Sequence, residues 1–182
     1  MKAVKFTMLI TACLYLFGCA SGANVQQMTY HGAQKTYAEP LQNNIAVTST
    51  TGGSGTNPLW TSEISNEAYS DALKRSLQSQ GLLSDNGQYQ LSVKMLKVEQ
   101  PLFGLDMRVT THVQYTLTDK ATNSIVLDET VIAPYTATIG DAFVAVTRLR
   151  MANEGSGKKN IEGLLAKLSA LQINPGDISM AP

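Results

Sequence analysis

The sequence predicts an α+β fold, a two-layer sandwich in which two helices lie on one face of a four-stranded sheet. Two stretches, 61–81 and 140–171, carry apolar residues at helical spacing, and the segments between them alternate with a period of two. The elements follow in the order strand, helix, three-strand antiparallel meander, helix. The length of 182 residues suits one such domain, and no internal repeat is visible.

The composition excludes several classes of protein. The chain has 14 basic and 14 acidic residues, so it has no excess positive charge with which to neutralise the phosphates of a nucleic acid. With 43% hydrophobic residues and no net charge, it does not have the composition of an intrinsically disordered chain. Two cysteines are too few for a disulfide-stabilised scaffold.

The N-terminal 18 residues have the composition of a targeting signal. Two lysines precede an apolar run over 6–17, which is too short for a membrane span of ~20 residues. The run ends in Leu16-Phe17-Gly18-Cys19, which resembles the lipobox of bacterial lipoproteins, where the cysteine is acylated and becomes the mature N-terminus. Leu16 and Gly18 match that pattern, and Phe17 is bulkier than usual. The alternatives are an uncleaved anchor helix and an ordinary cleaved signal, but neither explains the position of Cys19.

A lipid anchor on Cys19 would have three consequences. Palmitate and diacylglycerol chains would hold the protein on a membrane, since each buried CH₂ contributes ~0.8 kcal/mol. Cleavage before Cys19 removes Cys13, so the mature chain has no free thiol and, without its two N-terminal lysines, is slightly acidic. In the lipoproteins that the signal resembles, Asp after the cysteine retains the protein in the inner membrane. Ala20 at this position therefore favours the periplasmic face of the outer membrane.

Residues 19–43 are predicted to be the lipidated cysteine and a mostly flexible tether. Segment 20–43 contains many Gln, Asn, Thr and Gly residues and shows no sustained periodicity. As a flexible coil it would span roughly 27 Å root mean square. Tyr30, Tyr37 and Leu41 are the side chains that could dock part of it on the domain.

The compact domain is predicted over 44–172, and a short tail follows at 173–182. Its first strand is expected at 44–49, where apolar and polar residues mix with β-branched ones. The loop over 50–58 is rich in Gly, Ser and Thr. It lacks the Gly-Lys-[Ser/Thr] sequence of a phosphate-binding P-loop, so it indicates no nucleotide.

The first helix is expected to begin near Thr61 or Ser62, either of which can cap it. Its apolar stripe consists of Ile64, Ala68, Ala72, Leu73 and Leu77. Gly81 is the expected residue after the C-cap. Leu77 and Leu82 then occupy the two positions that make the hydrophobic contact of a Schellman ending.

Three strands follow, at 89–98, 105–117 and 125 to about 138. In each, apolar residues alternate with polar ones, which predicts one buried and one open face. The alternation slips at Met95-Leu96, and a β-bulge is the simplest explanation. Pro134 places the last strand at an edge of the sheet or at a bulge.

The last helix is predicted to open at Gly140-Asp141, with Asp141 as its cap. Its apolar positions are Val144, Ala145, Leu149, Ala152, Ile161, Leu164, Leu165, Leu168 and Leu171. Glycines at its centre, such as Gly155 and Gly157, each weaken a helix by about 1 kcal/mol relative to Ala. The pattern therefore predicts one long helix with a weak centre, or two helices.

The element order also suggests a family likeness. The segments that carry it are SLQSQGL at 76–82, VQYTLTD at 113–119 and RLRMAN at 148–153, and it extends over about 44–172. In this order the chain resembles the lipopolysaccharide-assembly lipoproteins of the LptE type and the ABC-type transport auxiliary lipoproteins. The resemblance implies the two-layer fold and a location in the bacterial envelope, and it assigns no functional residue.

The domain contains no recognisable set of catalytic or metal-binding residues. His112 is its only histidine and lies on the polar face of a strand, where a solvated side chain is expected. No cysteine remains in the domain, so no zinc-ligand spacing exists. Asp128 and Glu129 are adjacent in a strand and point to opposite faces, so they cannot form an acid–base pair. We therefore expect a protein that is not an enzyme and holds no cofactor or metal.

Two groups of residues could mediate contacts. The candidates for contact with a partner or with lipid are Leu102, Phe103 and Leu105 at a strand connection, and Trp60 at the exit of the 50–58 loop. The alternative is that the last helix or the tether covers them. The candidates for contact with lipid phosphates are Arg148, Arg150, Lys158 and Lys159. The alternative for these is an ordinary solvated helix face.

The sequence as a whole predicts a non-enzymatic, periplasm-facing lipoprotein. We expect it to act as a scaffold or auxiliary subunit of a cell-envelope complex, with a protein partner that the residues do not identify. The alternative is a carrier of a lipid or glycolipid, which would use an apolar groove between the helices and the sheet.

Overall fold

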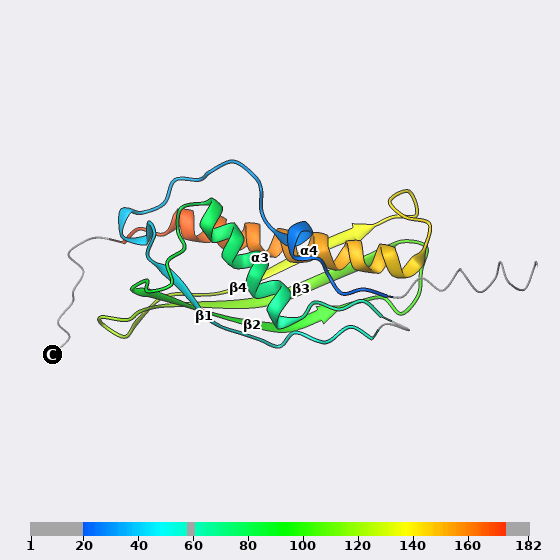
Figure 1. The fold of residues 1–182 in the computed structure, drawn as a ribbon, viewed down its shortest axis with the longest axis horizontal. Coiled ribbons are helices and arrows are strands. Elements are labelled where there is room, and N and C mark those ends of the chain that lie inside the picture. The colour runs from blue at the N-terminus through cyan, green and yellow to red at the C-terminus, as the bar shows by residue number, and fades with distance from the viewer. Residues whose placement is uncertain (1–19, 58–60, 174–182) are drawn as a thin grey trace, which may run out of the picture.

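The computed structural model describes residues 20–57 and 61–173, which form a four-stranded sheet with two long helices on one face (Figure 1). The predicted α+β sandwich, with its order of strand, helix, meander and helix, is confirmed. The signal segment, Cys19, Trp60 and residues 174–182 of the tail lie outside the described residues. None of the helices within the described ranges is long and apolar enough to cross a membrane.

The four strands lie side by side in chain order. They are β1 (Ile45–Thr51), β2 (Tyr89–Glu99), β3 (Met107–Asp119) and β4 (Ser124–Ala137). β1 is parallel to β2, so the chain between them must cross over, and helix α3 (Asn66–Ser79) makes this crossover. The remaining pairs are antiparallel, as predicted for the meander.

Both irregularities predicted for the sheet are confirmed. The register between β2 and β3 shifts between Met95 and Lys97, which is the bulge expected at Met95-Leu96. Pro134 lies in β4, which is an edge strand of the sheet and so tolerates a residue that lacks an N–H.

Helix α3 begins later than predicted. Its N-cap is Ser65, whose Oγ accepts a hydrogen bond from the backbone N–H of Ala68 at 3.1 Å. The expected caps, Thr61 and Ser62, lie before the helix in a segment that other contacts hold. The hydroxyl of Ser62 donates to the carbonyl oxygen of Ser21 at 2.8 Å, so it is not free to cap a helix.

The end of α3 is the predicted Schellman motif. Gly81 has φ +69°, a left-handed conformation that glycine adopts without strain. The N–H of Leu82 donates to the carbonyl of Leu77 at 2.9 Å, and the N–H of Gly81 donates to that of Gln78 at 3.0 Å. Leu77 and Leu82 are both fully buried, which supplies the hydrophobic contact.

Helix α4 (Ala145–Ala170) is one continuous helix, and the cap predicted for it is wrong. The N-cap is Val144, and no side chain caps the helix. Asp141 instead closes a turn before the helix, because its Oδ2 accepts from the N–H of Thr138 at 2.7 Å and from the Thr138 hydroxyl at 2.9 Å.

The glycines of α4 let the helix approach its neighbours closely. A Cβ added to Gly155 would overlap the ring of Tyr135 on β4, and one on Gly163 would lie 2.6 Å from Cγ1 of Val131. These positions face the sheet and therefore need hydrogen in place of a side chain. The glycines that weaken the helix as an isolated segment are the ones that let it pack.

Residues 20–43 are packed on the domain, in contrast to the flexible tether expected from their polar composition. The segment contains a short helix α2 (Val25–Met28) and a 3-10 helix η2 (Glu39–Leu41). It runs over the helical layer (Figure 1) and buries the apolar side chains Ala23, Met28, Tyr30, Tyr37 and Leu41 in the main core. Most of its polar residues face solvent, although Thr29 is buried, so apolar anchors together with a few hydrogen bonds to α3 and α4 hold its path.

A network of polar groups lies inside the helix–sheet interface. The hydroxyls of Tyr69 on α3 and Tyr115 on β3 are 2.5 Å apart, and the Tyr115 hydroxyl donates to Oδ1 of Asn160 on α4 at 2.8 Å. The Asn160 amide donates to the carbonyls of Thr111 and Val131 at 3.1 and 2.9 Å. Burial raises the pKa of both tyrosines above the usual value, so these side chains act as neutral donors and acceptors.

Candidate interaction surfaces

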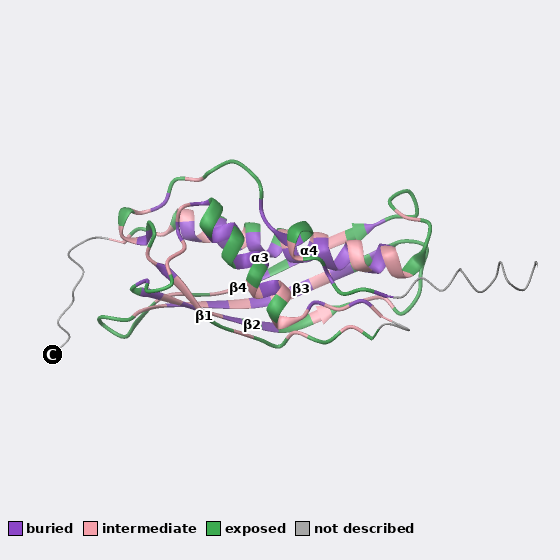
Figure 2. Cartoon of the chain, viewed as in Figure 1, coloured by how far each residue is buried: buried purple, intermediate pink, exposed green. Residues whose placement is uncertain are grey.

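Two connections lie at the same end of the sheet, where β2 joins β3 and where β4 joins α4 (Figure 1), and both contain exposed residues (Figure 2), several of them large and apolar. The first connection presents Leu102, Phe103 and Leu105, and the second presents Ile139, Phe143 and Val144. Leu102 is 95% exposed, Phe103 86% and Phe143 89%. We call these six residues the apolar end. The alternative expected for the first three, that the last helix or the N-terminal segment covers them, is wrong.

The second of these connections is held in place by buried contacts. Arg148 is only 4% exposed, and its Nη1 donates to the carbonyl oxygens of Ala142 and Phe143, both at 2.8 Å. The turn closed by Asp141 and Thr138 holds the start of the same connection. The backbone that carries Phe143 is therefore fixed from both sides, and this side chain is exposed from a well-defined loop.

The described chain begins at this same end of the molecule (Figure 1). Ala20 is buried, and together with Ser21 it lines a small depression beside Val146 and Thr147 in the first turn of α4. The Ser21 hydroxyl accepts a hydrogen bond from Nη1 of Arg150 at 2.8 Å. The chain is thus attached to α4 from its first described residues.

A polar cluster joins this start of the chain to the first apolar connection. Nε2 of Gln100 donates to Oδ1 of Asn153 at 2.9 Å and to the carbonyl of Ser62 at 3.1 Å. Nδ2 of Asn153 donates to the same carbonyl at 2.7 Å. The Ser62 hydroxyl in turn donates to the carbonyl of Ser21. Gln100 lies two residues before Leu102, so the cluster fixes the start of the chain relative to the apolar end.

Glu154 makes a second attachment between the N-terminal segment and α4. Its Oε1 accepts from the N–H of Asn24 at 3.0 Å and lies 3.5 Å from Nε of Arg150. Burial raises the pKa of this carboxyl above its usual value, although the hydrogen bond from Asn24 and the charge of Arg150 act in the opposite direction.

The four basic residues expected to meet lipid phosphates do not form one free cationic surface. Arg148 is buried and bonded to loop carbonyls, and Arg150 contacts Ser21 and Glu154. The ammonium of Lys159 lies 5.5 Å from the centre of the Tyr135 ring, a cation–π contact. Lys158 is half-buried. Arg148, Arg150 and Lys159 therefore connect α4 to its neighbours.

The second surface is the face of the sheet opposite α3 and α4, which we call the open face. His112 lies on this polar face, as predicted, between Lys97 on β2 and Ile132 on β4 in the strand register. Its side chain is only 24% exposed, in contrast to the solvated side chain expected, and its Nε2 lies 3.7 Å from Oε1 of Glu99. Ile132 and Leu96, the residue in the bulge beside Lys97, are large apolar side chains exposed on this face. The rest of the face is mainly polar and rich in Thr and Gln.

The predicted separation of Asp128 and Glu129 is confirmed. Oδ1 of Asp128 accepts from Nε2 of Gln114 at 2.9 Å on the open face. Oε2 of Glu129 accepts from Nζ of Lys167 on α4 at 2.9 Å. The two carboxylates therefore face opposite layers and make no acid–base pair.

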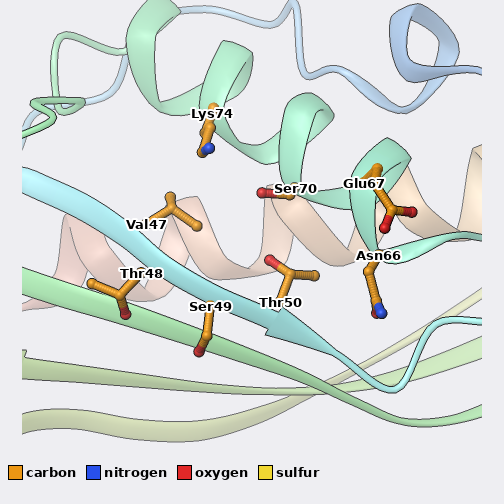
Figure 3. A pocket seen from close by; sticks show the side chains of 8 residues that line it. All are labelled: Val47, Thr48, Ser49, Thr50, Asn66, Glu67, Ser70 and Lys74. Carbon is orange, nitrogen blue, oxygen red and sulfur yellow. The ribbon is translucent and has the colours of Figure 1, made fainter.

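A shallow groove of about 230 Å³ lies between β1 and α3 (Figure 3). Its walls are Val47 to Thr50 on one side and Asn66, Glu67, Ser70 and Lys74 on the other. The side chain of Lys74 points toward β1 in this view. The lining is mostly polar and holds one acidic and one basic group, which does not match an apolar lipid.

The described residues form neither a metal site nor an internal groove for a lipid. Within 20–57 and 61–173, no three His, Cys, Asp or Glu side chains come together as a metal site. The space between the helices and the sheet, where a lipid carrier would need an apolar groove, is filled by the core side chains and the Tyr69–Tyr115–Asn160 network.

Phe143 and Ile139 belong to the apolar end but were absent from the candidate residues. The sequence predicts that the last helix starts at Gly140-Asp141, which puts Phe143 and Val144 inside a helix, whereas in the structure Val144 is the N-cap. The useful signal was present in the short apolar stretch Phe143-Val144 directly after a turn residue. In the structure this stretch lies in a loop before the helix, because Nη1 of Arg148 binds the carbonyl oxygens of Ala142 and Phe143. The sequence gives no sign of these hydrogen bonds.

The fold, a two-layer α+β sandwich with one parallel and two antiparallel strand pairs, defines a class shared with solved bacterial proteins. No protein-family model matches the sequence, and a comparison with curated proteins finds no match either. The chain is therefore compared by structure alone.

Three solved structures show the likeness. Protein XCC0632 from Xanthomonas campestris, described with the family model DUF330, has a TM-score of 0.54 and 11% identity, over 77% of this chain and 93% of that one. The hypothetical protein CT253 from Chlamydia trachomatis has a TM-score of 0.51 and 11% identity, over 71% and 97%. The PelC dodecamer from Paraburkholderia phytofirmans has a TM-score of 0.50 and 15% identity, over 77% and 96%.

At these identities the comparison shows the fold and nothing about function. None of the three is described as an LptE-type lipoprotein or as an ABC-type transport auxiliary lipoprotein. The family likeness suggested by the element order stays a prediction.

Proposed function

We propose that the protein is a lipoprotein of the bacterial envelope, acylated on Cys19, that acts as a non-enzymatic scaffold or auxiliary subunit of an envelope protein complex. We place it on the periplasmic face of the outer membrane. The observation that carries the scaffold role is the open face, a sheet surface that no other described element covers. Its exposed Leu96 and Ile132 beside His112 supply apolar contacts within a polar surround, the usual make-up of a protein interface.

The lipid anchor is supported by the sequence Leu16-Phe17-Gly18-Cys19 after an apolar run with a basic start. The outer-membrane location is supported by Ala20, which follows the cysteine in place of the Asp that favours retention. The alternative role as a lipid or glycolipid carrier finds no such support, since the helix–sheet interface is filled with core side chains.

Replacing Cys19 by Ser tests the anchor. In cells fed an alkyne analogue of palmitate, we expect the wild-type chain to be labelled and to fractionate with outer membranes, and the Cys19→Ser variant to lose labelling and signal cleavage together. Cys13→Ser is the matched control, since that residue lies inside the signal. Unchanged processing of Cys19→Ser would refute the lipobox interpretation.

Photo-crosslinking from the open face tests the scaffold role. A photoreactive residue at Ile132 should capture one defined envelope protein, whereas one at Glu162, exposed on the helical layer, should not. Loss of the chain should then lower the amount of that protein, with rescue by the wild type and not by Ile132→Asp. A protein of this fold is described as a dodecamer, so crosslinks only between copies of this chain would replace the scaffold role with self-assembly.

A further inference from the structure

We propose that the apolar end rests on the lipid bilayer that holds the acyl chains, so that the domain is docked directly on its membrane. The inference rests on the anchor proposed for Cys19. It assigns a specific occupant, the hydrocarbon and headgroup boundary of the bilayer, to residues Leu102, Phe103, Leu105, Ile139, Phe143 and Val144.

The described chain begins at the same end of the molecule as the apolar end (Figure 1). Ala20 is bonded directly to Cys19, and consecutive Cα atoms lie about 3.8 Å apart. Ala20 is itself buried against the first turn of α4, the helix that follows Phe143 and Val144. An acyl chain on Cys19 therefore starts at the apolar end, and no stretch of free chain separates the two.

Hydrogen bonds prevent the apolar end from turning away from the anchor. Ser21 is bonded to Arg150 on α4 and to Ser62, and Ser62 is bonded to Gln100 beside the first apolar connection. Asn24 is bonded to Glu154 one helical turn further along α4. These contacts fix the start of the chain, and so they fix which end of the molecule faces the membrane.

The side chains of the apolar end suit the interior of a bilayer. Two connections from different parts of the chain each expose a phenylalanine together with aliphatic side chains, and Arg148 holds one of them in shape. Large apolar side chains on an otherwise water-exposed end are stabilised by entering the acyl boundary of a bilayer. The charged residues beside them, Asp106, Arg108 and Asp141, are of mixed sign, so we expect binding to neutral lipid without a need for anionic headgroups.

This placement predicts how the domain stands on the membrane. The strands run from the apolar end to the turn between β3 and β4 (Figure 1). β3 has 13 residues, which at about 3.3 Å each places that turn about 40 Å from the apolar end. Ile125, a 63% exposed apolar side chain next to the turn, is therefore a control of the same chemistry that should stay in water.

Depth-dependent fluorescence quenching tests the docking. The acylated full chain has no free thiol, so Phe103→Cys, Phe143→Cys and Ile125→Cys each give a single site for a fluorescent label. In phosphatidylcholine vesicles that carry a nitroxide on the acyl chain, we expect several-fold stronger quenching of the labels at 103 and 143 than of the label at 125. Equal and weak quenching at all three sites would overturn the docking.

The same samples separate the docking from the anchor and from a protein partner. If the protein does not float with the vesicles at all, the anchor proposal fails. If it floats and the labels at 103 and 143 remain unquenched, only the docking fails.

A measurement in whole cells detects a protein partner at the same site. The label at 103 could be unquenched in vesicles and yet shielded from an aqueous quencher in cells. This result would assign the apolar end to a protein and overturn the proposal. A Phe103→Asp and Phe143→Asp double variant should float equally well and lose the quenching of a label at 105.

Discussion

Helices α3 and α4 lie in the same layer and on the same sheet, yet they are specified in different ways. α3 has a serine cap, an apolar stripe and a glycine ending, all of which lie within its own segment. α4 has no side-chain cap and contains three glycines. Contacts with other elements define it, through Asn160 to the strands, Gly155 to Tyr135 and Arg148 to the preceding loop. Local signals suffice for the first helix, whereas the second depends on its surroundings.

The largest expected effect comes from the contact that ties α4 to the sheet. Asn160→Leu removes the amide that satisfies the carbonyls of Thr111 and Val131 and the hydroxyl of Tyr115. Each buried polar group left without a partner costs ~1–3 kcal/mol, so the free energy of unfolding should fall by about 3 kcal/mol or more. Urea unfolding measures this. Glu162→Ala, exposed on the same helix, should stay within about 0.5 kcal/mol, and a loss below about 1 kcal/mol for Asn160→Leu would contradict the role of the network.

The close approach of α4 to β4 gives the next largest effect. Gly155→Ala adds a methyl group against the ring of Tyr135, and overpacking of this kind costs ~1–3 kcal/mol. The better helix propensity of alanine returns about 1 kcal/mol, so we expect a net loss of about 1 kcal/mol. Thermal unfolding of this variant should be compared with Gly55→Ala, where an added methyl group meets open space. If Gly155→Ala were more stable than the wild type, the helix propensity of α4 itself would outweigh its contact with Tyr135. α4 would then be specified by its own residues, as α3 is.

The cap of α3 gives a smaller effect, local to that helix. Ser65→Ala removes the acceptor for the N–H of Ala68 and should lower the free energy of unfolding by about 1 kcal/mol. Thr61→Ala, at one of the positions where the sequence suggested the cap, removes a partly buried hydroxyl that donates to Oε1 of Glu63 at 3.0 Å, and it should cost less than Ser65→Ala. Urea unfolding measures both losses of free energy. A larger loss for Thr61→Ala than for Ser65→Ala would show that the helix begins where the sequence suggested.

The smallest effect concerns Glu154, which joins α4 to the N-terminal segment. Its folded pKa is raised above the usual 4.5, so between these two values the folded chain binds a proton that the unfolded chain has released. Stability should therefore fall as pH rises through that window. Glu154→Gln should flatten this pH dependence and stay within about 0.5 kcal/mol of the wild type at neutral pH. A variant that is clearly less stable at neutral pH would show that the carboxylate stabilises the fold as an anion.

The same contrast explains how much could be predicted from the sequence. The fold class, the Schellman ending at Gly81 and the bulge at Met95-Leu96 depend on patterns of a few neighbouring residues, and all three are confirmed. The start of α4 could not be predicted because Asp141 has the features of a cap, while its carboxylate is used by Thr138 in the turn before the helix. The tolerance of α4 for glycine depends on Tyr135, which lies on another element.

The candidate surfaces were predicted only in part, for the same reason. Leu102, Phe103 and Leu105 could be found because they interrupt a strand pattern. Phe143 could not be grouped with them until the two connections were seen at one end of the sheet. The packing of segment 20–43 was missed because its five buried apolar core residues are diluted by many polar ones.

The packed N-terminal segment limits where the protein can act. With the anchor that we propose on Cys19, a flexible segment of this length would let the domain range over roughly 27 Å above the membrane. Because the segment is folded onto the domain, the anchored protein would instead be confined to a layer one molecule thick and would move in two dimensions. Its effective concentration toward other membrane-bound proteins would rise accordingly, and a binding partner would itself have to reach the membrane surface to meet it.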